Sequence, residues 1–293
     1  MNIELDWKYL IDGGSENNSF KIWDGEKFPL FSGFDLYYRI EKGLAKIVDG
    51  KVILFNNDYG MQEHNGLKVP FKPYYLKPDE NKTCYYFGDK KYDNRSKKII
   101  NYIASKNVIF DNDTKRNLKK FRNKFADRLT IIKVDKNNIT NYSEYANYIF
   151  KTWKKNRMDE KKLFNPRLAK YKIAFEKGFD YYDDMDYYLF KIDNVPVAYS
   201  ITLPVNNLIT NFEINMTLDY LGEEKLTGIG KFIYAFGTRY NKTPYWCMGY
   251  SGRKGLSSLK EEFTVYTINN YLTEFWNEEK KKEQTNKITE WFE

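Results

Sequence analysis

The sequence has few of the residues that most often hold metals, with two cysteines and one histidine among 293 residues. Cys84 and Cys247 form no CxxC pair, so we expect no disulfide framework, no zinc site and a reducing compartment. The single histidine, His64, excludes His-rich metal centres and most Ser-His or Cys-His chemistry unless this residue carries it. Its context, NDYGMQEHNGLKVP, is typical of turns and favours a solvated loop histidine over a catalytic base. No bound metal is expected.

Long apolar runs are also absent. The longest, from Val195 to Val205, is interrupted by Pro196 and falls short of the ~20 residues that a membrane helix needs. The opening letters, MNIELDWKYL, are acidic and contain few apolar residues, unlike a signal peptide. We therefore expect a soluble, cytoplasmic protein without a membrane span.

Aromatic residues and positive charge are plentiful. Tyr, Phe and Trp make up 18% of the chain, which predicts a folded protein whose core contains many large rings. The formal net charge is +8, which favours an anionic partner such as a nucleic acid, a phospholipid or a nucleotide. The acidic residues are interspersed among the basic ones, so the charge alone does not single out one of these partners.

The first part of the chain is predicted to be a small α+β unit. Two strands are expected on either side of Asp49-Gly50, a strong hairpin signal, and a third strand is expected at 82–89. The segment RSKKIINYIASKN, residues 95–107, has apolar residues at helical spacing and predicts a helix. We place the boundary of this unit at residue 112.

Residues 111–129 predict a basic amphipathic helix. Asp111 or Asp113 can cap its start, and Leu118, Phe121 and Phe125 share one face. Lysines and arginines fill the positions between them. This pattern fits an anion-binding helix and a merely solvated face equally well.

The remainder predicts a mixed order of helices and strands. A strand is expected at 129–134, helices at 143–156 and 165–178, and three strands between 186 and 217. The segment EEKLTGIGKFIYAF, residues 223–236, then opens a helix with two glycines. A strand at 244–251 and a helical or mixed segment follow. The predicted fold class is α+β.

This order resembles the GNAT acyltransferase fold, in which a Q/R-x-x-G-x-G/A turn faces the diphosphate of coenzyme A at a helix amino terminus. The matching letters are KLTGIG at 225–230, with lysine where glutamine or arginine is usual. The alternative is a tight strand-to-helix connection without a ligand. The resemblance implies that the donor-binding residues are Lys225, Thr227, Gly228, Ile229, Gly230 and Lys231.

Three further segments resemble the C-terminal domain of the phosphatidylglycerol lysyltransferases. They are TKRNLKKFRNKF at 114–125, KIDNVPVAYSIT at 191–202 and SGRKGLSSLKEEF at 251–263. The resemblance implies two tandem GNAT-like units, 1–112 and 113–293, each a mostly antiparallel sheet flanked by helices. Its Fem-type relatives take aminoacyl groups from tRNA. It also implies a set of substrate-binding residues: Lys115, Arg116, Asn117, Arg122, Arg253 and Lys260.

One departure concerns the residues before Gly252. The family usually has acidic residues there, whereas this chain has CMGY at 247–250. We therefore do not carry over the lipid substrate. For Arg253 and Lys260 the alternative is a solvated face of the last helix.

Acyl transfer to an amine needs a base, a polarised carbonyl and close positioning. Two strands that splay apart leave backbone N–H groups free to polarise the carbonyl, and in the GNAT fold this place lies beside the strand before the glycine turn. The resemblance assigns that strand to NFEINMT at 211–217. Glu213 is then the predicted base, directly or through water, and the alternative is an outward-facing residue in a strand. Tyr250, with Ser251 beside it, is the predicted general acid, although chance placement competes in a chain with 26 tyrosines.

The predicted function is transfer of an acyl or aminoacyl group from acyl-CoA, such as acetyl-CoA, or from aminoacyl-tRNA to an amine or hydroxyl acceptor. One alternative is a nucleic-acid-directed transferase that acts on a modified DNA base and binds tRNA or DNA through the basic helix. The other is a catalytically silent protein that binds a ligand with the same fold.

Overall fold

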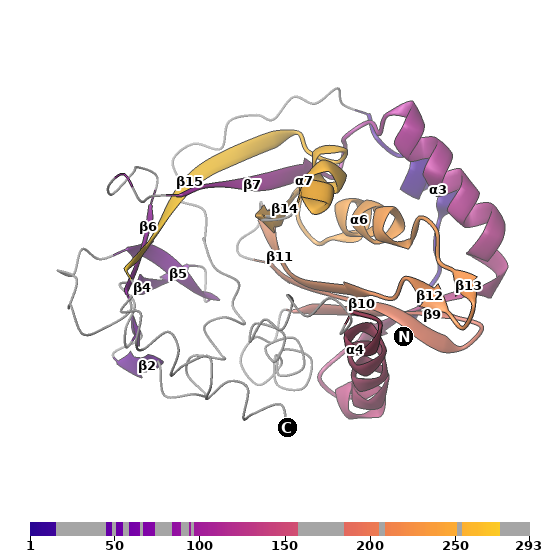
Figure 1. Cartoon of the computed structure of the whole chain (residues 1–293), viewed down its shortest axis with the longest axis horizontal. Helices are drawn as coiled ribbons and strands as arrows, with labels where there is room; N and C mark the ends of the chain where they lie inside the picture. Colours follow the sequence, from indigo (N-terminus) through magenta and orange to yellow (C-terminus); the bar gives the residue numbers. More distant parts are fainter. Residues whose placement is uncertain are drawn as a thin grey trace.

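The computed structural model describes residues 1–15, 45–48, 51–54, 59–64, 67–73, 84–88, 94, 97–157, 185–204, 209–250 and 254–275. Within these residues the centre of the protein is a nine-stranded sheet in the order β1-β8-β9-β10-β11-β14-β7-β15-β6 (Figure 1). Neighbouring strands are antiparallel, except that β11 and β14 are parallel. The strands span Asn2–Ile3 (β1), Leu129–Val134 (β8), Asp186–Ile192 (β9), Val195–Pro204 (β10), Ile209–Thr217 (β11), Tyr245–Tyr250 (β14), Lys97–Ser105 (β7), Tyr266–Phe275 (β15) and Cys84–Gly88 (β6).

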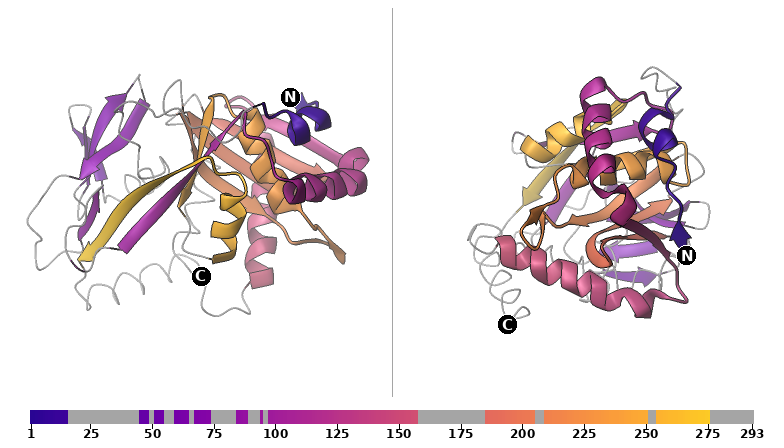
Figure 2. Two further views of the ribbon diagram at one scale, coloured as in Figure 1. Left: turned by 90° about the horizontal axis from the view of Figure 1, so that it is seen from above. Right: turned by 90° about the vertical axis from the view of Figure 1, so that its right-hand side faces the viewer.

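Helices cover both faces of this sheet (Figure 2). Helix α6 (Ile229–Tyr240) lies on one face, with α1 (Trp7–Asp12), α3 (Asn112–Phe125) and α7 (Lys254–Glu261) around it. Helix α4 (Ser143–Arg157) lies on the other face, against β10 and β11. Two short 3-10 turns, η1 (Ala126–Arg128) and η2 (Ile139–Tyr142), precede β8 and α4. The mixed α+β class is as predicted.

Within the described ranges, three short hairpins lie outside the large sheet. The predicted hairpin at Asp49-Gly50 is confirmed, because β2 (Ala45–Val48) pairs antiparallel with β3 (Lys51–Leu54). Strand β4 (Tyr59–His64) pairs with β5 (Leu67–Pro73), and β12 (Tyr220–Leu221) pairs with β13 (Glu224–Lys225). The predicted loop position of His64 was therefore wrong, since this residue ends β4 opposite Leu67.

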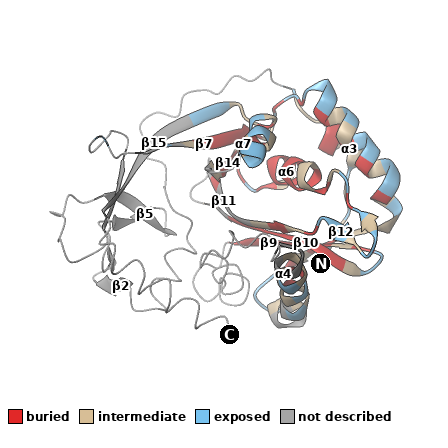
Figure 3. Ribbon diagram, viewed as in Figure 1, coloured by how far each residue is buried: buried red, intermediate tan, exposed pale blue. Residues whose placement is uncertain are grey.

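Helix α6 forms the centre of the core. Its sequence, IGKFIYAFGTRY, is apolar on nearly every side, and Figure 3 shows it buried along most of its length. Phe232 and Phe236 contact the ring of Phe190 on β9 edge to face. Gly237, next to Phe236 in the chain, lies against the fully buried Trp246 of β14. These contacts fix α6 above the sheet.

Helix α3 confirms the predicted amphipathic pattern. The Asp111 carboxylate caps it by accepting a 2.6 Å hydrogen bond from the Thr114 amide. Leu118, Phe121 and Phe125 are buried, and Phe121 stacks on Phe232 of α6. The opposite side of α3 faces solvent (Figure 3).

The predicted helix at 95–107 was wrong, because residues 97–105 form β7, paired with β14 on one side and β15 on the other. Residues 101–105 are all buried. A strand buried on both faces is apolar at consecutive positions and is easily mistaken for a short helical face. The last predicted segment is mixed, with α7 followed by β15. The helix predicted at 165–178 lies outside the described residues.

Strands from both sides of residue 112 meet in the large sheet. Strand β1 pairs with β8, and β7 lies between β14 and β15. The division into units 1–112 and 113–293 stays a prediction. Across the described part of the chain, helices of bilayer-spanning length and hydrophobicity are not found.

Candidate functional site

Strands β11 and β14 separate after a short stretch of pairing. They pair from Ile209 opposite Tyr245 to Asn211 opposite Cys247. Beyond Asn211, β11 continues to Thr217 with β10 on one side. On its other side no strand among the described residues pairs with it. We call this part of β11, residues 212–217, together with its side that lacks a strand partner among the described residues, the strand gap.

A bulge lies in β11 where the gap begins. The adjacent residues Ile201 and Thr202 of β10 pair with Ile214 and Phe212, which leaves Glu213 opposite no residue. A bulge bends its strand and increases the local twist. Glu213, the predicted base, therefore lies in the backbone irregularity that turns β11 away from β14.

Strand β14 has a bulge of its own at the same end. Cys247 pairs with Ile103 of β7, whereas Tyr250 pairs with Asn101, so three steps along β14 match two along β7. Gly249 takes a positive φ of 66° within this bulge. Only glycine adopts such a backbone conformation at little cost. Tyr250, the predicted acid, ends β14; the side chains of Glu213 and Tyr250, and all of Ser251 and Arg253, lie outside the described residues.

The amino terminus of α6 follows β11 after the β12–β13 hairpin. Gly228 is the residue before the helix, with φ at 91°. The Ile229 amide donates to Leu226 O at 3.1 Å, and the Phe232 amide donates to Gly228 O at 2.9 Å. The amides of Gly230 and Lys231 have no acceptor within a helix that begins here. Thr227 is exposed and both glycines are half-buried, so this end of the helix is not sealed inside the core.

Two other helices border this glycine turn. A Cβ atom built on Gly228 would lie 3.6 Å from Phe121 Cβ and 3.9 Å from Asn117 O, both on α3. A Cβ atom on Gly230 would lie 3.6 Å from Leu259 Cδ2 on α7. The turn thus lies between α3 and α7.

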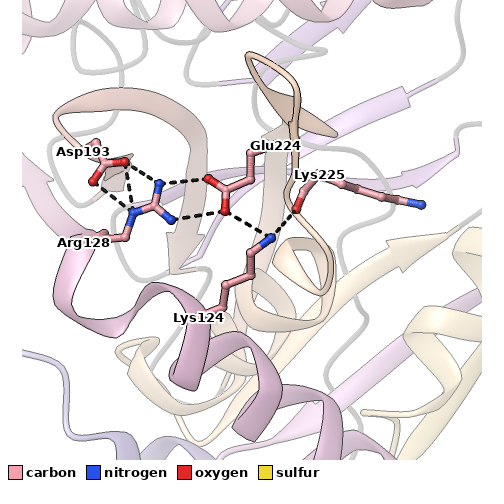
Figure 4. Close-up of polar contacts among 5 residues, drawn as sticks. All are labelled: Lys124, Arg128, Asp193, Glu224 and Lys225. Carbon is pink, nitrogen blue, oxygen red and sulfur yellow. Dashed lines mark hydrogen bonds and ion pairs between the residues drawn. The ribbon is translucent and has the colours of Figure 1, made fainter.

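Four charged side chains hold the hairpin that leads into the turn (Figure 4). Arg128 donates to Asp193 in the β9–β10 turn and to Glu224 in β13. Lys124 Nζ lies 3.1 Å from Glu224 Oε1 and donates to Lys225 O at 3.2 Å. We call Lys124, Arg128, Asp193 and Glu224 the hairpin clamp. It joins α3, the β9–β10 turn and the backbone just before the glycine turn.

The clamp residues stabilise one another's charged forms. Hydrogen bonds from Arg128 and then Lys124 lower the pKa of Glu224 from 4.5 to about 2. The hydrogen bond from Arg128 also lowers the pKa of Asp193, and the two carboxylates raise the pKa of Arg128. The four charges cancel, so the clamp positions the hairpin rather than attracting an anion.

The clamp predicts a specific loss of stability in acid. A folded-state pKa below the unfolded value means that Glu224 stabilises the fold above pH 4.5 and that this contribution is lost as the pH falls through about 2. We expect Arg128→Met to make the melting temperature less sensitive to pH across this window than it is in the wild type. Parallel melting curves for the two proteins would contradict the role of the clamp.

A second ionic contact holds the first turn of α6. Lys231 Nζ lies 2.6 Å from Glu262 Oε2, and the Thr114 hydroxyl of α3 donates to the same oxygen at 3.0 Å. Glu262 follows α7 in the chain. The side chain of Lys231, a predicted donor-binding residue, is therefore paired within the protein.

Lys260 does not lie on a solvated helix face. It is buried on α7, and its ammonium group donates to Met248 O in the β14 bulge. Burial lowers its pKa from 10.5 to about 8. Lys260 thus links α7 to the strand that borders the gap.

The predicted substrate-binding residues of α3 have partners nearby. Lys115 pairs with Asp12 and Arg116 with Asp113, each at 3.0 Å. The Asn117 side chain donates to Asp113 O, and Arg122 donates to the neighbouring Asn123. Lys119 and Lys120, which were not in the predicted set, are exposed on the same helix.

Sequence reasoning missed the hairpin clamp and Glu262. The clamp joins residues 65 and 96 positions apart, and Thr114 lies 148 positions from Glu262. No short motif connects such positions. No group of three or more metal-binding side chains occurs within the described ranges.

No family model and no curated protein matches the sequence. Among solved structures, the chain is similar to a conserved protein of unknown function from Bacteroides thetaiotaomicron, with 11% identity, a TM-score of 0.51, and coverage of 78% of this chain and 84% of that one. It is also similar to L-PGS from Bacillus licheniformis (11% identity, TM-score 0.44, 66% and 68% covered). A third similar structure is a GCN5-related N-acetyltransferase-like protein from Streptococcus suis, with 13% identity, a TM-score of 0.36, and coverage of 80% of this chain and 91% of that one. At 11% identity, the similarity to the Bacteroides thetaiotaomicron protein concerns the fold alone.

Proposed function

We propose that the protein transfers an acyl or aminoacyl group to an acceptor in the strand gap. The group comes from an anionic carrier, either coenzyme A or tRNA, that binds at the amino terminus of α6. One observation carries this proposal. The two parallel strands separate at paired bulges, and the chain leaving the gap runs through the hairpin into a helix that begins at Gly228. Among the described residues no strand pairs with this side of β11, so its backbone groups could polarise a carbonyl, and the first amides of α6 could bind a phosphate.

The reaction would proceed by attack of an acceptor nitrogen or oxygen on the carrier's carbonyl carbon. A new bond forms between these atoms, and the bond from the carbonyl carbon to the carrier's sulfur or oxygen breaks. In this proposal Glu213 takes the proton from the acceptor, directly or through water. Tyr250, with Ser251 beside it, returns a proton to the leaving group. Backbone amides of the strand gap stabilise the negative charge on the carbonyl oxygen.

The carrier would be held mainly by backbone groups. Gly228 has no side chain, so a phosphate can approach the backbone closely there. The amides of Gly230 and Lys231 point out of the helix end. Lys225 and Thr227 are exposed beside them. The predicted substrate-binding residues of α3, together with Arg253, would contact more distant phosphates of the carrier. Lys260 would not contact the carrier, and its hydrogen bond to Met248 O would hold the bulge of β14 in place.

Coenzyme A tests the proposed donor. At a concentration of ~100 times its dissociation constant, coenzyme A should stabilise the protein by about 2.7 kcal/mol, which a thermal shift measures. Gly228→Ala should weaken this effect, since a side chain at φ 91° strains the turn. Gly222→Ala is the matched control, because Gly222 also has a positive φ of 59° but lies in the β12–β13 hairpin, where an added Cβ atom would meet nothing within 4 Å.

The results of these binding experiments distinguish acyl-CoA from aminoacyl-tRNA as the donor. Stabilisation by coenzyme A that Gly228→Ala weakens and Gly222→Ala preserves would support acyl-CoA. No shift with coenzyme A, together with steeply salt-dependent binding of aminoacyl-tRNA, would assign the donor to tRNA. Binding of neither would contradict the proposed function.

A further inference from the structure

The carboxylate of Glu262 lies where the surrounding groups favour a negative charge. Its Oε2 atom contacts the ammonium group of Lys231 and the hydroxyl group of Thr114. Lys231 is the third residue of α6, and Thr114 is the third residue of α3. The first turns of helices favour negative charge, because their amides carry partial positive charge. Glu262 therefore supplies an internal anion beside the proposed phosphate site.

The ion pair between Lys231 and Glu262 is only partly exposed to solvent. Thr114 is fully buried, whereas the side chains of Lys231 and Glu262 are 24% and 27% exposed. An ion pair at this depth is screened less than a surface pair, and it remains within reach of a ligand from solvent. Lys231 can therefore exchange one anionic partner for another.

The backbone around Glu262 is fixed. The Phe263 amide donates to Lys260 O at 3.1 Å, and the Thr264 amide donates to Glu261 O at 3.2 Å. Phe263 is fully buried against Phe110 and Tyr234. Release of Lys231 would therefore need a rotation of the Glu262 side chain and no movement of α7.

We propose that Glu262 competes with the carrier's phosphate for Lys231 and thereby lowers the affinity of the protein for its carrier. This inference rests on the proposed function, because it assumes that the phosphate binds at the amino terminus of α6. The carboxylate of Glu262 neutralises Lys231 in the structure. When a phosphate arrives, it must either displace Glu262 or share the lysine with a like charge. Both routes weaken binding.

Removing the charge of Glu262 should therefore strengthen binding. Glu262→Gln keeps an oxygen that can accept from Thr114 and leaves Lys231 available to a phosphate. We expect its dissociation constant for coenzyme A, measured by calorimetry, to fall by about three- to tenfold, the range set by charged contacts of this kind. Glu261→Gln is the matched control, because Glu261 is exposed and the change in net charge is the same. We expect it to stay within about twofold of the wild type, as for other exposed charges.

A double-mutant cycle locates the effect on Lys231. In a Lys231→Met background, Glu262→Gln should no longer strengthen binding, because the shared lysine is gone. The same titrations with bulk tRNA cover the other donor. Equal affinities for Glu262→Gln and Glu261→Gln would overturn the inference and leave the proposed function intact. If the wild type binds neither coenzyme A nor tRNA, the proposed function fails and the inference fails with it.

Discussion

Replacing Gly237 with alanine is expected to destabilise the protein by about 3 kcal/mol, as overpacking of a rigid core does. The added Cβ atom would lie 2.5 Å from Trp246 Cη2 and 2.8 Å from Cζ2 and Cζ3. The Trp246 ring is fully buried in β14 and has no flexible end that could move aside. The clash outweighs the ~1 kcal/mol that alanine gains over glycine inside a helix. Denaturant unfolding measures the difference.

Gly255→Ala is the matched control for this substitution. Gly255 also lies in a helix, α7, and a Cβ atom there would meet nothing within 4 Å. We expect the free energy of unfolding to stay the same or rise slightly, because alanine restricts the unfolded chain. If the two variants were equally stable, α6 would not pack on β14 as described.

The second large effect concerns the rate of acyl transfer. Glu213→Gln should lower kcat by about 10²–10⁴-fold, the usual contribution of a general base. Glutamine keeps the size of the side chain, so the bulge in β11 should persist. Release of free thiol from acetyl-CoA in the presence of a panel of amines measures the rate.

Glu223→Gln serves as the control for Glu213. Glu223 is exposed in the β12–β13 hairpin, and its substitution removes the same charge. We expect the control to keep the wild-type rate. If Glu213→Gln were within about twofold of the wild type, far below the effect of losing a general base, the base would be another group.

Local patterns correctly predicted elements that depend on nearest neighbours. The Asp49-Gly50 signal lies between β2 and β3, which pair as a hairpin. Helix α3 begins where Asp111 can cap it. Helix α6 begins directly after Gly228, as the glycine turn predicted. All of these depend on contacts between residues a few positions apart.

Patterns failed where distant segments decide the outcome. Residues 97–105 form β7 because β14 and β15 pair on either side of it, and residues 101–105 are buried there. For Lys260 the sequence left a ligand contact and a solvated helix face open, and the structure buries its ammonium group against the Met248 carbonyl. In both cases burial by distant strands outweighed the local preference.

The amino-acid sequence by itself determined the α+β class, most helix and strand identities and the glycine-opened helix, because periodicity, caps and turn residues act over a few positions. Only the tertiary structure decided which charges are already paired. The clamp at Arg128 and the contact of Glu262 with Lys231 form because folding brings together groups that are far apart in the chain. Coulombic attraction depends on distance in space, and no local pattern records that distance.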